Sequence, residues 1–242
     1  MFKHDTHLHF DLYKNRQGII DYVELNKSYT IGVTNLPDIY ERYIGLDKDR
    51  KYFKIALGFH PELVPDYHNQ IQKFKKYAKD ARYIGEIGLD YTVQDLNKQQ
   101  IQRSTFDKIT TACNDYGEKI LTVHSRRAEK DVLSVLCGLN NCKVILHWYS
   151  GSLSNMDVAL NRGYYFSINY QMIQSQNGRR IVNNIPNERL LIESDGPFNK
   201  GIEDTYNLKF QNDIYYYLME KRGLASKELS EMLRNNFMCL LK

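Results

Sequence analysis

Short apolar, β-branched segments alternate with longer amphipathic segments along the whole chain, and this alternation most constrains the fold. Eight of the short segments are expected to be strands: Phe2–His7, Tyr29–Thr34, Lys54–Phe59, Tyr83–Leu89, Ile120–His124, Lys143–His147, Tyr164–Asn169 and Leu190–Glu193. The amphipathic stretches between them predict helices, among them Gln17–Asn26, His68–Asp80, Lys98–Tyr116, Arg127–Leu139 and Leu153–Asn161. Two further helices, Thr205–Arg222 and Ser226–Leu241, are expected to follow the eighth strand.

Consecutive β-then-α units of this kind favour a parallel sheet that closes on itself. Neither a linker rich in Pro and Gly nor a change of composition divides the 242 residues. We therefore expect an α/β fold, a single (β/α)8 TIM barrel with C-terminal closing helices, in which residues 1–242 form one domain. In such barrels the functional site lies at the carboxyl ends of the strands, where the loops converge.

Histidines gather at these expected strand ends. Five of the seven lie at or directly after the carboxyl end of a strand: His7, His9, His60, His124 and His147. His7 and His9 are two positions apart on an extended segment, so both imidazoles project to the same face and can reach one metal ion. A lone histidine is more often structural, and we expect His4 and His68 to be so.

Two carboxylates complete the pattern. Glu86 lies within an otherwise apolar strand, where burial is costly unless the carboxylate binds a metal or a cation, although half of a buried ion pair is the alternative. Asp195 follows the last strand, and Asp5 is expected to orient a ligand imidazole rather than to bind metal. Because all these groups fall at one end of one barrel, we expect six metal ligands: His7, His9, Glu86, His124, His147 and Asp195.

The types of ligand indicate a reaction. Imidazole and carboxylate without thiolate suit Zn, Mn or Fe, or Mg with fewer histidines, and a bridging carboxylate such as Glu86 can hold two divalent ions. Two such ions activate water for hydrolysis, with Asp195 placed to act as the general base. Neither a Gly-rich phosphate loop nor a Ser/His/Asp arrangement competes with this interpretation.

The composition of the chain indicates its cellular environment rather than its activity. The net charge of +4 neither requires nor excludes a polyanionic substrate, and the 19 tyrosines favour half-buried packing positions over nucleobase stacking. The four cysteines, which form no CxxC pair, favour reduced thiols, and no segment is apolar enough for a signal peptide or a membrane span. We expect a cytoplasmic protein with no membrane partner.

Six segments together resemble the TatD-type metal-dependent deoxyribonucleases, in the order of that family. They are Asp5-x-His7-x-His9, Gly58-Phe59-His60-Pro61, Gly85-Glu86-Ile87-Gly88-Leu89-Asp90-Tyr91, Val123-His124-Ser125-Arg126, His147-Trp148-Tyr149-Ser150-Gly151 and Glu193-Ser194-Asp195-Gly196-Pro197. The resemblance implies an amidohydrolase-type barrel with two divalent metal ions (Mg, Mn or Zn) that hydrolyses DNA phosphodiester bonds, often from the 3′ end. The implied partner is DNA that is single-stranded or has accessible ends.

The resemblance also implies roles for single residues. Ligands of one ion would be His7, His9, Glu86 and Asp195, and Glu86, His124 and His147 would serve the second. His60 and Arg126 would contact the substrate phosphate, although a salt bridge on the rim is an equal alternative for Arg126.

The segment Phe198–Asp204 departs from the Pro-, Arg- and Gly-rich loop usual in the family. A divergent branch with TatD-like nucleases of multi-gene antiphage systems is compatible with this departure and would bring protein partners. Two other functions stay open: a related barrel hydrolase acting on an ester or amide, and a partner-binding subunit in which catalysis is vestigial or conditional.

Overall fold

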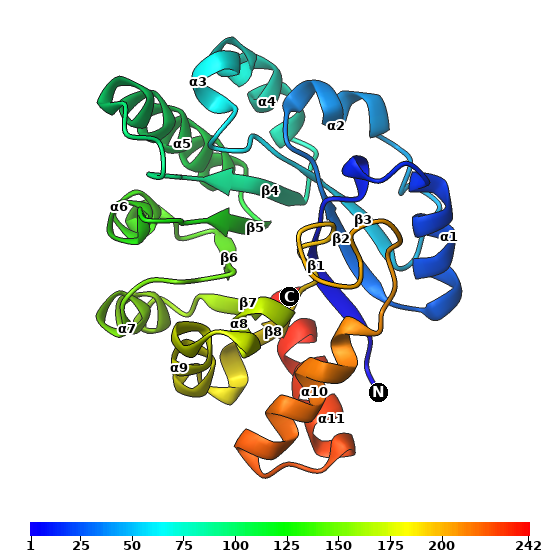
Figure 1. Cartoon of the computed structure of the whole chain (residues 1–242). Coiled ribbons are helices and arrows are strands. Elements are labelled where there is room, and N and C mark those ends of the chain that lie inside the picture. The colour runs from blue at the N-terminus through cyan, green and yellow to red at the C-terminus, as the bar shows by residue number, and fades with distance from the viewer.

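The computed structural model describes residues 1–242, and its centre is one parallel sheet of eight strands (Figure 1). In chain order the strands are β1 (His4–Leu8), β2 (Tyr29–Val33), β3 (Phe53–Leu57), β4 (Tyr83–Gly88), β5 (Lys119–His124), β6 (Cys142–His147), β7 (Tyr165–Ile168) and β8 (Leu190–Ile192). Each strand pairs in parallel with the next one in the chain. The α/β barrel expected from the alternation, a (β/α)8 TIM barrel, is confirmed.

The barrel is closed by the segment that follows β8. Between β1 and this segment there is a single parallel bridge, which joins Leu8 to Gly196. The amide of Asp195 donates to the carbonyl of His7 at 2.9 Å, and the amide of His9 donates to the carbonyl of Gly196 at 3.0 Å. The chain after the last strand is therefore fixed against the carboxyl end of the first strand.

Helices surround the strands (Figure 1). They are α1 (Arg16–Asn26), α2 (Pro37–Tyr43), α3 (Val64–Tyr67), α4 (Ile71–Ala78), α5 (Leu96–Tyr116), α6 (Glu129–Val135), α7 (Leu153–Asn161), α8 (Tyr170–Gln174), α9 (Gln176–Asn184), α10 (Phe210–Arg222) and α11 (Ser226–Leu240). Short 3-10 turns are η1 (Phe10–Leu12), η2 (His68–Gln70), η3 (Leu136–Gly138) and η4 (Asn187–Arg189). None of the helices combines the length and the apolar character needed to cross a membrane.

Several expected helices are shorter in the structure. The helix expected to begin at Arg127 begins at Glu129, because Arg127 has a φ of +57°, which an α-helix does not allow. The helix expected from Thr205 begins at Phe210, because the side chain of Asn207 accepts from the amide of Lys209 and forms a turn there.

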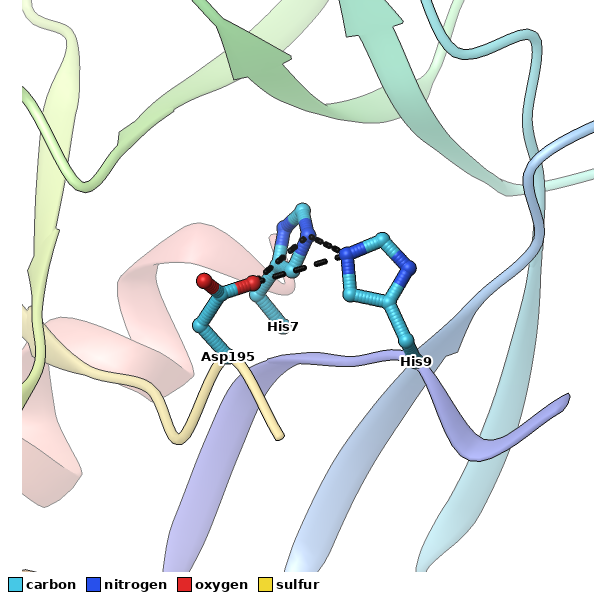
Figure 2. A group of neighbouring side chains, drawn as sticks. All are labelled: His7, His9 and Asp195. Atoms are coloured by element: carbon cyan, nitrogen blue, oxygen red, sulfur yellow. Dashed lines mark hydrogen bonds and ion pairs between the residues drawn. The ribbon is translucent and has the colours of Figure 1, made fainter. Parts of the chain in front are cut away.

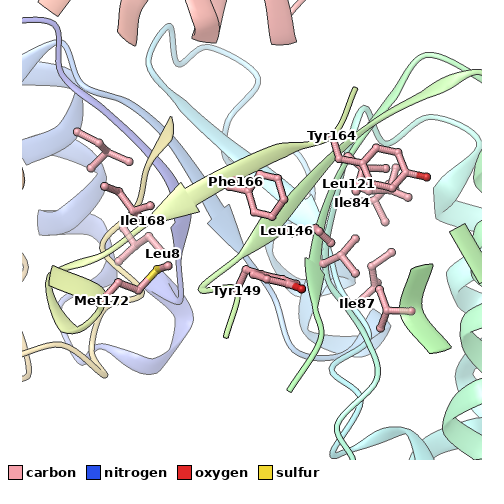
Figure 3. Close-up of a cluster of buried hydrophobic side chains, with 14 of the residues drawn as sticks. Leu8, Ile84, Ile87, Leu121, Leu146, Tyr149, Tyr164, Phe166, Ile168 and Met172 are labelled. Atoms are coloured by element: carbon pink, nitrogen blue, oxygen red, sulfur yellow. The ribbon is translucent and has the colours of Figure 1, made fainter. Parts of the chain in front are cut away.

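Two buried clusters stabilise the barrel. The larger cluster joins strands to helices, and Figure 3 shows part of it, including Ile84, Leu121 and Phe166. In the second cluster, side chains of seven strands meet Phe237 and Leu240 of α11. Phe237 also packs against Phe2 and Tyr29, so α11 covers the end of the barrel where the strands begin. The opposite end is left for a site.

Candidate metal centre

All the histidines and carboxylates expected to bind metal lie together at the carboxyl ends of the strands. His7 lies in β1, and His9 directly follows that strand. Glu86 lies in β4, β5 ends at His124, β6 ends at His147, and Asp195 follows β8. The cavity above these side chains has a volume of about 430 Å³. Residues far apart in the chain meet because the barrel topology places every strand end at the same opening.

His7, His9 and Asp195 form one compact group (Figure 2). The Nε2 atoms of the two imidazoles are 3.3 Å apart, and Asp195 Oδ1 lies 3.7 Å from His7 Nε2 and 3.4 Å from His9 Nε2. Asp195 has a φ of +47°, a left-handed conformation that aspartate tolerates better than most residues. The turn after β8 thus brings a carboxylate to His7 in β1 and to His9 directly after it.

Glu86 stands between two sets of imidazoles. Its Oε2 lies 3.2 Å from His9 Nε2 and 3.5 Å from His7 Nε2, whereas its Oε1 lies 2.6 Å from His124 Nδ1 and 2.9 Å from His147 Nε2. The side chain is buried, and Oε2 has no hydrogen-bond partner within the protein. An orphaned carboxylate oxygen with imidazole nitrogens on both sides fits a bridging metal ligand.

The charges of the centre support one another. Burial alone would raise the pKa of Glu86, but the charges of nearby imidazoles, foremost His60 and His147, hold it well below its usual value. Burial would lower the pKa of His9, yet the nearby carboxylates of Asp195 and Glu86 raise it to about 10. The carboxylates therefore stabilise positive charge inside the protein, which is the charge that a divalent cation brings.

Each of three imidazoles also has a partner behind it, and these partners were not predicted as site residues. His7 Nδ1 lies 2.8 Å from Thr122 Oγ1. His124 Nε2 lies 2.8 Å from Asp90 Oδ2, and His147 Nδ1 lies 3.4 Å from Glu193 Oε1. Such contacts fix the ring orientation of a metal-binding histidine.

A signal for two of these partners is present in the sequence. Asp90 ends the Gly85–Asp90 segment that contains Glu86, and Glu193 stands two positions before Asp195. Both are nearly fully buried, and a buried carboxylate needs partners. Both stand at strand ends, as the expected ligands do, and this position is the signal in the sequence that marks them.

Asp5 acts differently from the expectation that it would orient an imidazole. Its Oδ1 accepts from the backbone amides of His7 at 3.1 Å and Ser194 at 2.9 Å, and its Oδ2 accepts from the hydroxyl of Tyr206 at 2.8 Å. Asp5 therefore fixes the backbone at His7 and Ser194 and does not contact an imidazole of the centre. The structural role expected for His4 is confirmed, since its Nε2 accepts from the buried amide of Ile192 at 3.1 Å.

The two expected phosphate contacts lie at different depths. His60 is mostly buried, with Nε2 3.2 Å from Glu86 Oε2, and it forms a further possible metal-binding group with Glu86 and His124. Arg126 is exposed on the cavity wall and forms no salt bridge, so the alternative of a rim ion pair is not realised. None of the 19 tyrosines lines the cavity, which agrees with their expected packing role.

The chain is similar in sequence to known metal-dependent hydrolases. The sequence profile of the family described as TatD related DNase matches residues 4–242. An uncharacterised metal-dependent hydrolase of Buchnera aphidicola subsp. Baizongia pistaciae is 27% identical over 260 residues, which cover 99% of this chain and 96% of that protein. A Xenopus laevis protein with the provisional name of a deoxyribonuclease, tatdn3-B, is 26% identical over 195 residues, which cover 75% of this chain and 69% of that protein.

A solved structure shares the fold. The TatD homolog YjjV from Escherichia coli K12 aligns with a TM-score of 0.85 and 21% sequence identity, and the alignment covers 98% of this chain and 97% of that one. The two proteins therefore share the barrel fold over nearly their whole length.

Proposed function

We propose that this metal-dependent hydrolase, which belongs to the TatD-related DNase family, cleaves the phosphodiester bonds of DNA with a water molecule at two divalent metal ions. One observation carries the proposal: the two oxygens of the buried Glu86 carboxylate face different sets of imidazoles. Such an arrangement supports a carboxylate bridge between two ions. Residues 1–242 would act as one TatD-like domain.

The ligands divide between the two oxygens of Glu86. On the Oε2 side, His7, His9 and Asp195 would hold one ion. On the Oε1 side, His124 and His147 would hold the other. Imidazole and carboxylate ligands support Mg, Mn or Zn as the metals.

The residues of the centre divide the chemical work. When bound, divalent ions lower the pKa of water and neutralise charge on a phosphate. Asp195 lines the cavity, and its Oδ1 lies beside the imidazoles of His7 and His9, so its carboxylate is placed to accept the proton of the attacking water. His60 and the exposed guanidinium of Arg126 can donate to phosphate oxygens.

The size of the cavity supports a narrow substrate. A volume of about 430 Å³ lies within the range of small-molecule sites, and it accommodates a nucleotide rather than a double helix. DNA that is single-stranded or has accessible ends is therefore the proposed substrate, cleaved as by a 3′ exonuclease.

Metal analysis and strand cleavage test this function together. Protein purified without chelator is expected to carry about two divalent ions per chain and to shorten 3′-labelled and 5′-labelled single strands. Glu86→Gln and Asp195→Asn should remove cleavage, whereas Glu188→Gln, an exposed control, should not. Full activity in both site variants would overturn the assignment.

The phosphate contacts need a separate readout. His60→Asn and Arg126→Ala are expected to keep the metal content of the unmodified protein but to raise KM for DNA, because they contact substrate rather than metal. Loss of metal in His60→Asn would instead place His60 among the ligands.

A further inference from the structure

The cavity above the metal centre has polar and charged walls with two exceptions. Of its 13 lining residues only two are hydrophobic, and both are aromatic: Trp148 and Phe198. Trp148 follows β6 and Phe198 lies in the loop after β8, so the two rings enter from different parts of the barrel opening. A site that bound phosphate alone would not need either ring.

Phe198 is exposed, which is unfavourable for a large apolar side chain. Its side chain is 57% exposed, although burying a phenylalanine ring would stabilise the protein. Its ring meets the His9 imidazole edge to face, with the centroids 5.3 Å apart and an interplanar angle of 84°. One side of the ring is thus fixed beside a candidate metal ligand while the rest stays open to the cavity.

Hydrogen bonds hold the backbone of Trp148 in an uncommon conformation. Its φ of +38° lies in the left-handed region, which is unfavourable for a bulky side chain. The buried carboxylate of Glu193 accepts from the amide of Trp148 at 3.1 Å and is itself held by Asn169 and Ser167. The surrounding hydrogen bonds therefore maintain a strained residue at the wall of the site.

We propose that Trp148 and Phe198 form a nucleobase subsite beside the metal centre. The inference rests on the proposed function, and it assigns the base of the nucleotide whose phosphate is attacked to these two rings. Aromatic faces stack with any base, so the subsite recognises a base without selecting its identity. The charged walls suit the phosphate and the sugar of the same nucleotide.

The chain offers an internal probe of this subsite, because Trp148 is its only tryptophan. Thymidine 5′-monophosphate and 2-deoxyribose 5-phosphate share the sugar phosphate, differ in the base, and contain no phosphodiester bond to cleave. We expect the first to quench the fluorescence of Mg²⁺-loaded protein with a saturable curve, and the second not to quench it at the same concentration. Equal effects of both compounds would overturn the proposal.

Single substitutions measure how much the aromatic rings contribute to nucleotide binding. Phe198→Ala is expected to weaken thymidine monophosphate binding about tenfold, equivalent to ~1.4 kcal/mol, and to leave inhibition by inorganic phosphate unchanged. Tyr216→Ala, which removes an exposed aromatic ring on α10, is the matched control and should change neither. Unchanged nucleotide affinity in Phe198→Ala would contradict the subsite.

Kinetics separate this proposal from the function on which it rests. Phe198→Ala and Trp148→Leu should raise KM about tenfold for an oligothymidylate but not for the same strand made of abasic residues, with kcat little changed. If the protein cleaves DNA without distinguishing these strands, the subsite is wrong and the nuclease stands. If it binds the nucleotide but cleaves neither strand, the nuclease function is wrong and the subsite stands.

Discussion

The imidazole of His124 lies between the carboxylates of Glu86 and Asp90, and the Asp90 carboxylate fixes the orientation of the ring. Asp90 Oδ2 is 2.8 Å from His124 Nε2, which leaves Nδ1 for the centre. Asp90→Asn is expected to weaken Mn²⁺ binding ten- to a hundredfold, the usual effect of losing such a contact, and calorimetric titration measures it. Asp115→Asn, an exposed control, should bind Mn²⁺ like the unmodified protein, and equal affinity in both variants would remove Asp90 from the site.

His4 makes the protein sensitive to acid by burial alone. Burial lowers the pKa of His4 to about 3, whereas the unfolded chain takes up the same proton near 6.5. The unfolded state therefore binds more protons between these values, so this contribution to stability is complete above pH 6.5 and is lost as the pH falls toward 3. Its upper limit is about 5 kcal/mol.

A matched pair of variants isolates the His4 contribution. His4→Gln keeps an acceptor for the Ile192 amide but cannot titrate, so its free energy of unfolding should fall less between pH 7 and pH 4 than that of the unmodified protein. Urea unfolding at each pH gives the difference. His68→Gln changes an exposed histidine and should leave the pH profile unaltered; identical profiles for all three proteins would contradict the burial argument.

At the level of whole elements, Asp5 is one of the side chains that join the first strand to the chain after the last strand. Asp5 accepts from the backbone amides of His7 and Ser194, and both residues are buried. Asp5→Ala leaves these groups unpaired, and each costs about 1–3 kcal/mol. We expect a loss of about 3 kcal/mol, which lowers Tm by about 6–12 °C in a chain of this length. Asp5→Asn keeps Oδ1 as an acceptor and should lower Tm less; equal losses would show that the charge matters instead.

The periodicity of the sequence predicted which elements exist better than where they end. Apolar strand runs and amphipathic helices are set by many residues at once, so all eight strands were found. Helix ends depend on single local events, such as the positive φ of Arg127 or the turn made by Asn207. The closure at Asp5 joins residues far apart in the chain, and nothing in a local pattern announces it.

For the molecule as a whole, the barrel topology is what made the centre predictable. A residue at the carboxyl end of any strand must reach the same opening, so side chains from β1 to β8 could be grouped without coordinates. Asp90 and Glu193 also stand at strand ends, but the pattern does not separate ligands from the residues that orient them, because that distinction depends on ring orientation. The expected role in antiphage defence, with its protein partners, stays a prediction.

Metal binding should stabilise the entire barrel, because the proposed ligands come from both ends of the chain and from the middle. Mn²⁺ at a hundredfold excess over its Kd adds about 2.7 kcal/mol to the free energy of unfolding, or about 5–11 °C in Tm. Chelated protein melted with and without Mn²⁺ measures this shift. Glu86→Gln should lose most of it, since Glu86 faces both sets of imidazoles, while His4→Gln should retain it. A shift of equal size in Glu86→Gln would mean that Mn²⁺ binds elsewhere, and no shift in the unmodified protein would mean that the cluster holds no metal.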